Sequence, residues 1–151
     1  MGTVRYFEDF PPGQVTELGS YPPLTEEQIV EFARQWDPQY FHVDPVRAKE
    51  SLFGGLVASG WQTGAILMRL YVDNVLASSA SLGSPGLDQI RFLRPVRPGD
   101  RLAGRQTVLE AEESASRPGV GKLRSRFELF NQDGDAVFMM EAWGLFQRRP
   151  D

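Results

Sequence analysis

The sequence has no cysteine and only one histidine, and these two absences exclude several kinds of functional site. Without cysteine the chain can form no disulfide, no thiolate metal centre and no cysteine nucleophile. A zinc centre built from several histidines is excluded as well, because His42 stands alone. No D-x-D-x-D-G loop for a hard cation occurs either. The sequence therefore predicts no metal site.

Positive charge is also scarce. The 16 basic residues are outnumbered by 20 acidic ones, which gives a formal net charge of -4, and only Lys49 and Lys122 are lysines. Binding to nucleic acid requires a basic face that neutralises phosphates. We therefore expect no nucleic-acid partner.

Long apolar runs are missing too. The longest apolar segment, residues 65–77, carries Arg69 and Asp73 and is too short and too charged to span a bilayer. Residues 1–14 contain acidic residues and prolines where a signal peptide would need an apolar run. These features predict a cytoplasmic protein without a membrane partner.

The 151 residues, of which 41% are hydrophobic, suit a single globular domain over residues 1–151. Helix signals fill the first half. Thr25 and Gln28 form a capping box, which predicts a helix over about 25–36 that ends before Pro38. A short helix is expected over about 45–50, and a long helix over about 60–77 that is apolar on more than one face.

Strand signals dominate the second half. Alternating apolar residues and turn residues between them predict these strands: 14–21, 87–96, 101–113, 121–131 and 136–147. Helices and strands are thus segregated, which indicates an α+β protein. One long apolar helix needs a sheet around it, so we expect a hot-dog fold, in which a curved antiparallel β-sheet wraps around one central helix. Its open sheet edge favours a homodimer.

Asp37 and His42 are the first candidates for chemistry. They lie five residues apart, and Pro38 ends the helix between them, so a tight turn can bring the carboxylate and the imidazole together. Such a pair can hold water and exchange protons near neutral pH. The alternative is that Asp37 is an ordinary turn residue and His42 a structural one. Asp44 also flanks His42, but capping of the helix that begins at Pro45 accounts for it.

The start of the long helix is the second candidate. Gly60 at a helix N-terminus would let a ligand approach a free backbone N–H, where the helix dipole favours negative charge. A developing thioester enolate is one such anion. Ser59 is expected to cap the helix. The alternative for Gly60 is close packing of the helix on the sheet.

The segment 33-ARQWDPQYFHVDPVRAKESLFGGLVASGW-61, together with 91-RFLRPVRPGD-100, resembles the MaoC-like dehydratases, a family of hot-dog enzymes that includes (R)-specific enoyl-CoA hydratases. The resemblance extends over about residues 25–147. It implies a hydro-lyase of fatty acid metabolism that reversibly hydrates trans-2-enoyl thioesters to (R)-3-hydroxyacyl thioesters, with coenzyme A or an acyl carrier as part of the substrate. It assigns water activation to Asp37 and His42 and the oxyanion N–H to Gly60.

The resemblance implies no cofactor beyond the substrate's own coenzyme A. Contacts to substrate are expected from Ser59, Trp61, Gln62 and Arg91. Met68 departs from the family, which often has serine there. Two other functions remain open: a hot-dog thioesterase that directs water at the carbonyl, and an acyl-thioester-binding protein without activity.

Overall fold

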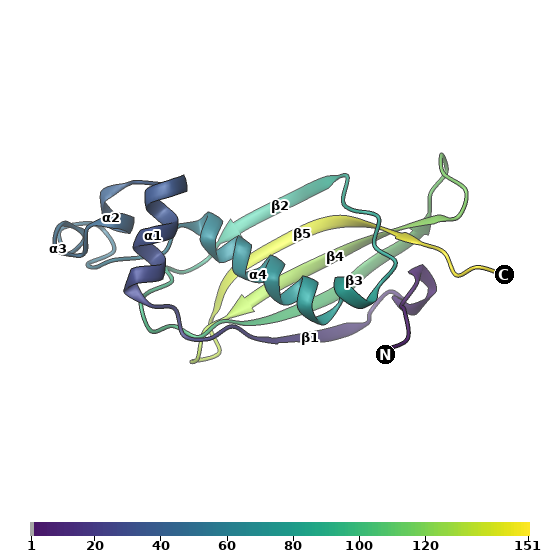
Figure 1. The fold of residues 1–151 in the computed structure, drawn as a ribbon, viewed down its shortest axis with the longest axis horizontal. Helices are drawn as coiled ribbons and strands as arrows, with labels where there is room; N and C mark the ends of the chain where they lie inside the picture. Colours follow the sequence, from purple (N-terminus) through teal and green to yellow (C-terminus); the bar gives the residue numbers. More distant parts are fainter. Residues whose placement is uncertain (1) are drawn as a thin grey trace.

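The computed structural model describes residues 2–151. Its elements are η1 (Phe7–Asp9), β1 (Val15–Ser20), α1 (Glu26–Trp36), α2 (Tyr40–Val43), α3 (Pro45–Ala48), α4 (Gly60–Asn74), η2 (Leu76–Ser78), β2 (Gly86–Phe92), β3 (Ala103–Glu113), β4 (Val120–Phe130) and β5 (Ala136–Gln147). The strands form one antiparallel sheet in the order β1-β3-β4-β5-β2. The helix α4 runs diagonally across one face of this sheet (Figure 1). This is the hot-dog arrangement that the sequence predicts.

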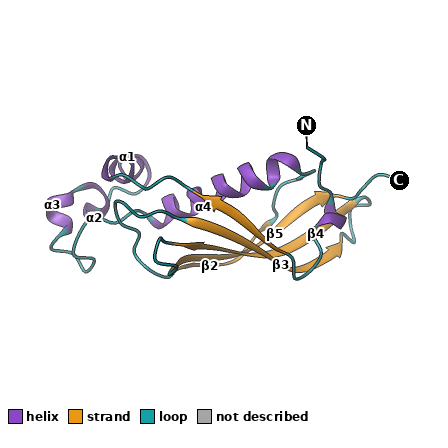
Figure 2. Ribbon diagram, turned by 90° about the horizontal axis from the view of Figure 1, so that it is seen from below, coloured by secondary structure: helices purple, strands orange, loops and turns teal. Residues whose placement is uncertain are grey.

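Two layers make up the fold. Seen from the side, the strands curve beneath α4, and α1, α2 and α3 gather beyond its N-terminal end (Figure 2). The face of the sheet under α4 is apolar because alternate residues of each strand point inward, as Leu123, Phe127 and Leu129 of β4 do. They pack with Leu67 and Leu70 of α4 into one core. Burying this apolar area is the main force that holds the helix on the sheet.

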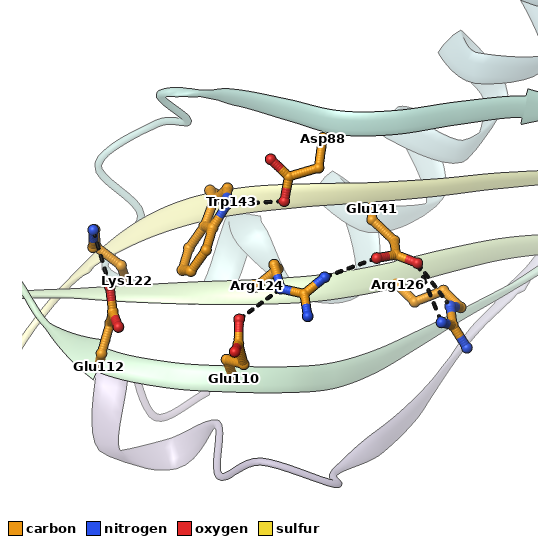
Figure 3. A network of polar contacts seen from close by, with 8 residues as sticks. All are labelled: Asp88, Glu110, Glu112, Lys122, Arg124, Arg126, Glu141 and Trp143. Atoms are coloured by element: carbon orange, nitrogen blue, oxygen red, sulfur yellow. Dashed lines mark hydrogen bonds and ion pairs between the residues drawn. The ribbon is translucent and has the colours of Figure 1, made fainter.

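The opposite face of the sheet is charged. Arg124 of β4 bonds Glu110 of β3 at 2.6 Å and Glu141 of β5 at 2.8 Å, and Arg126 also reaches Glu141 (Figure 3). Lys122 pairs with Glu112 in the same way at 3.0 Å. Opposite charges on neighbouring strands favour this register, and a shift by one residue would turn the charges into the core.

Several element boundaries differ from the sequence-based expectations. The long helix ends at Asn74, three residues early, because the Asn74 amide donates to the carbonyl oxygens of Leu18 and Leu70. The strand expected over 87–96 ends at Phe92, since the N–H groups of residues 93 and 94 both turn to the Val137 carbonyl and residue 95 is a proline. The short helix expected to reach about residue 50 stops at Ala48.

Within residues 2–151, none of the helices combines the length and the apolar character that crossing a bilayer would need.

The buried and the exposed face of α4 should contribute differently to the free energy of unfolding. The adjacent residues Leu67 and Met68 test this difference. Leu67 is 1% exposed and Met68 is 47% exposed. We expect Leu67→Ala to lower the free energy of unfolding by about 2–5 kcal/mol, because it leaves a cavity in the core. Met68→Ala should change it by about 0.5 kcal/mol or less. Urea denaturation measures both. Equal losses would mean that α4 is rotated relative to the sheet.

Candidate active site

Local structure brings Asp37 and His42 to one point. The helix α1 ends at Trp36, and the Asp37 N–H still donates to Ala33 at 2.8 Å. After Pro38 the chain forms α2, a single helical turn with Gln39 at its N-cap position, which places His42 in its last residues. The sequence predicts a tight turn here, and the structure supplies it as a one-turn helix.

The imidazole of His42 is held from both sides. Its Nδ1 lies 2.6 Å from the Val57 carbonyl oxygen, and its Nε2 lies 3.2 Å from Oδ2 of Asp37. A carbonyl oxygen only accepts, so Nδ1 carries a proton. Nε2 is therefore the atom left for proton exchange, and a proton placed on it is hydrogen-bonded by Asp37. The ring is 6% exposed, which keeps it in this orientation.

Asp37 is a carboxylate at neutral pH. Partial burial raises its pKa, but hydrogen bonds from the side chains of Gln39 and Ser59 and the charge of His42 hold the pKa below its usual value. Gln39 Nε2 lies 2.7 Å from Oδ1, so Oδ2 alone faces His42. The carboxylate is thus oriented by Gln39 and Ser59 and paired with His42.

Asp44 has a different role. Its Oδ1 accepts from the N–H groups of Val46 and Arg47 at 3.1 Å each, which caps α3. The structure therefore separates the two carboxylates that flank His42: Asp37 faces its imidazole, and Asp44 starts the next helix.

The N-terminus of α4 meets this pair. Ser59 is fully buried and caps the helix, with its Oγ accepting from the Trp61 N–H at 3.2 Å. Within residues 2–151 the Gly60 N–H has no hydrogen-bond partner. A Cβ at this position would overlap the ring of Phe92, so only glycine fits without displacing that ring. The contact with Phe92 agrees with the close-packing interpretation of Gly60, and the binding of an oxyanion by its N–H stays a prediction.

One cavity of about 340 Å³ unites these groups. Asp37, His42 and Gly60 line it together with Trp61, and its other walls include Thr63, Phe92 and Arg94. Trp61 is 63% exposed and stands at the rim. A carboxylate, an imidazole nitrogen and a free backbone donor at the positive end of a helix dipole therefore face one space.

Not every residue considered from the sequence lies there. Gln62 turns away: its amide donates to the Gln28 carbonyl at 3.2 Å, and it lines a groove between α1 and α4. Arg91 lies outside the cavity lining, on β2. Met68 lines a second cavity farther along α4. The sequence reasoning missed Gln39, although its position two residues after Asp37 across a proline was a usable signal.

Among the described residues, no three side chains of the His, Asp or Glu type lie close enough together to hold a metal ion.

Known proteins resemble this chain over most of its length. The family model "MaoC like domain" matches residues 9–125. A crystal structure of a MaoC-like dehydratase from Rhodospirillum rubrum superposes with a TM-score of 0.88 at 36% identity, over 97% of this chain and 99% of that one. The uncharacterized protein YdeM of Bacillus subtilis is 31% identical over 93% of this chain and 98% of its own length.

A third relative carries a more specific name. The 3-hydroxyacyl-thioester dehydratase Z of Mycobacterium tuberculosis is 34% identical over 92 residues, which is 60% of this chain and 61% of that protein. The match thus spans less than two thirds of that dehydratase. The family match extends over more than half of this chain and includes Asp37, His42 and Gly60. The chain belongs to the MaoC-like dehydratase family.

Proposed function

We propose that the protein is a hydro-lyase that reversibly adds water to trans-2-enoyl thioesters, giving (R)-3-hydroxyacyl thioesters. The observation that carries this proposal is the meeting of Asp37, His42 and the unpartnered Gly60 N–H in one cavity. The name of one relative, a 3-hydroxyacyl-thioester dehydratase, supports the same reaction.

In the hydration direction, Asp37 takes a proton from a water molecule as the oxygen of that water bonds to C3. The C2–C3 π electrons move toward the thioester oxygen, where the Gly60 N–H stabilises the developing negative charge. The Nε2 proton of His42 then goes to C2. A proton passed from Asp37 to His42 across their 3.2 Å contact restores the starting state. Because no electrons are gained or lost overall, this chemistry needs no redox cofactor.

The thioester would arrive as coenzyme A or as an acyl carrier. Arg94 lines the cavity, and 60% of its side chain is exposed beside Asp135. We infer that Arg94, rather than Arg91, is the cation best placed to meet substrate phosphates. Its guanidinium can bind a phosphate through two parallel hydrogen bonds.

We also propose a homodimer built on the edge strand β2. Leu87, Phe92 and Leu93 at this edge are each about half exposed, and Trp61 and Met68 of α4 add exposed apolar area beside them. A strand edge with apolar side chains is a template for pairing with a second copy.

The acid–base pair can be tested by substitution. Asp37→Asn and His42→Ala should each lower kcat for crotonyl-CoA hydration by at least ~10²-fold, because each removes a proton-transfer group. Asp44→Asn is the matched control: it keeps the capping oxygen and should leave kcat within about twofold, since Asp44 does not line the cavity. Chiral analysis should find the (R)-alcohol. Full activity in folded Asp37→Asn would remove this residue from the mechanism.

The role of the Gly60 N–H can be separated from that of the glycine's small size. Gly60→Pro removes the N–H at the first helical position, where proline is well tolerated. Gly60→Ala keeps the N–H but places a Cβ against Phe92, as proline also does. We expect kcat of Gly60→Pro to fall about 10²–10³-fold below that of Gly60→Ala. Equal kcat values in the two variants would assign Gly60 to packing alone.

Sedimentation equilibrium tests the dimer. The expected mass is twice the 17.0 kDa of the chain. Leu87→Lys on β2 should shift the protein toward the monomer by like-charge repulsion across the new strand pair. Val15 is similarly exposed on the opposite edge strand β1, and Val15→Lys should leave the dimer intact. The reverse pattern would place the interface at β1.

A further inference from the structure

The aromatic ring of Phe92 lies against the first residue of α4. A Cβ added to Gly60 would come within 2.4 to 2.7 Å of three carbon atoms, and all three belong to this ring. Such distances are shorter than any van der Waals contact, so the ring fills the space that a side chain of residue 60 would need. The same ring also lines the first cavity, together with Asp37 and His42.

The ring lies on the side of Gly60 from which a ligand would approach. In a helix the Cα–Cβ bond tilts toward the N-terminus, and the N–H groups of the first turn point toward the same end. Because the Phe92 ring takes the place of a Cβ on Gly60, it lies toward the end of α4 at which the Gly60 N–H points outward. An oxygen atom that accepts from this N–H therefore has the Phe92 ring beside it.

Neighbouring aromatic residues hold the ring in this position. Phe92 is the last residue of β2 and pairs with Phe138 of β5. The centroids of these two rings are 6.0 Å apart, and the Trp61 ring meets Phe92 edge to face at 6.5 Å. Phe138 is 1% exposed and belongs to the core, so the Phe92 ring cannot shift in that direction. The ring is thus a fixed wall of the cavity, although 56% of Phe92 is exposed.

The acyl carbon nearest to this wall would be C2. The carbonyl carbon of a thioester has two other neighbours, the sulfur atom and C2. Sulfur is common to all thioesters, so only C2 differs between one acyl group and another. In the proposed mechanism, the side of C2–C3 that faces Asp37 and His42 must stay open for water and for the proton. A methyl group on C2 would therefore be pressed toward the Phe92 ring, and extra volume in a filled space is unfavourable.

We propose that Phe92 makes the active site selective for acyl thioesters that carry no substituent on C2. This inference rests on the proposed function, because it takes the ligand to be a thioester whose carbonyl oxygen is held at Gly60. Straight-chain 2-enoyl and 3-hydroxyacyl thioesters fit beside the ring, whereas their 2-methyl-branched counterparts do not. Phe92 thereby determines specificity, and the proton transfers remain with Asp37 and His42.

Binding of two unreactive isomers tests this role separately from catalysis. Pentanoyl-CoA and 2-methylbutanoyl-CoA contain the same atoms, and only the second is branched at C2. Calorimetry should show that the unsubstituted protein binds pentanoyl-CoA about 10-fold more tightly than either enantiomer of the branched isomer. Phe92→Ala and Phe92→Val should each reduce this preference to about twofold or less, because the ring is removed.

Leu93→Ala is the matched control. Leu93 is the next residue in the chain, lines the same cavity and is 47% exposed. The three atoms nearest to a Cβ on Gly60 all belong to Phe92, so Leu93→Ala should keep the full preference for the unbranched isomer. Thermal melting checks the folding of each variant, and the valine variant retains a good strand former if the alanine variant fails to fold.

Equal affinities of the two isomers for the unsubstituted protein would overturn the inference, as would a preference that survives in the folded Phe92 variants. A preference that Leu93→Ala abolishes as fully as Phe92→Ala would also contradict it. Crotonyl-CoA hydration, measured in parallel, reports on the proposed function alone. A hydratase without isomer preference would refute only the role of Phe92, whereas an isomer preference without hydration would refute only the reaction.

Discussion

The hydrogen bond between His42 and the Val57 carbonyl is the contact on which the proposed chemistry depends. At 2.6 Å it fixes the Nδ1 proton, and so it leaves Nε2 directed at Asp37. It also joins the segment that carries His42 to the segment that leads into α4, because Val57 lies three residues before Gly60. The Val57 N–H donates to the Phe41 carbonyl at 3.1 Å, so two hydrogen bonds connect these segments. The three groups of the proposed mechanism, Asp37, His42 and the Gly60 N–H, are thereby tied to one another through short segments.

The helix α4 contributes to two separate cavities. One end of the helix presents Gly60 to the first cavity, and its second half lines the second cavity. The charged outer face of the sheet helps to maintain this geometry, since the ion pairs of Arg124 and Arg126 hold β3, β4 and β5 in register. The same sheet thus positions a core on one face and is solvated on the other.

Much of the fold could be predicted from short-range rules. Thr25 and Gln28 form the expected capping box with hydrogen bonds of 3.1 and 3.0 Å, and the helix ends before Pro38 as expected. The strands lie where apolar residues alternate with polar ones. This pattern suits a strand because every second side chain points to the same face of the sheet. Helix boundaries were less predictable where a hydrogen-bond partner is distant in sequence. At the end of α4, the Asn74 amide donates to a carbonyl of β1 that lies 56 residues away.

The sequence by itself determined which side chains are available. One histidine, a carboxylate five residues before it and a serine–glycine helix start limit the chemistry, and residue types alone establish those limits. Only the tertiary structure decided which of these groups meet. It turned Asp37 toward His42 and Asp44 toward a helix start, it sent Gln62 to another groove, and it paired Gln106 of β3 with Ser125 of β4. Local sequence encodes local hydrogen bonds, whereas contacts between distant segments follow from how α4 packs on the sheet.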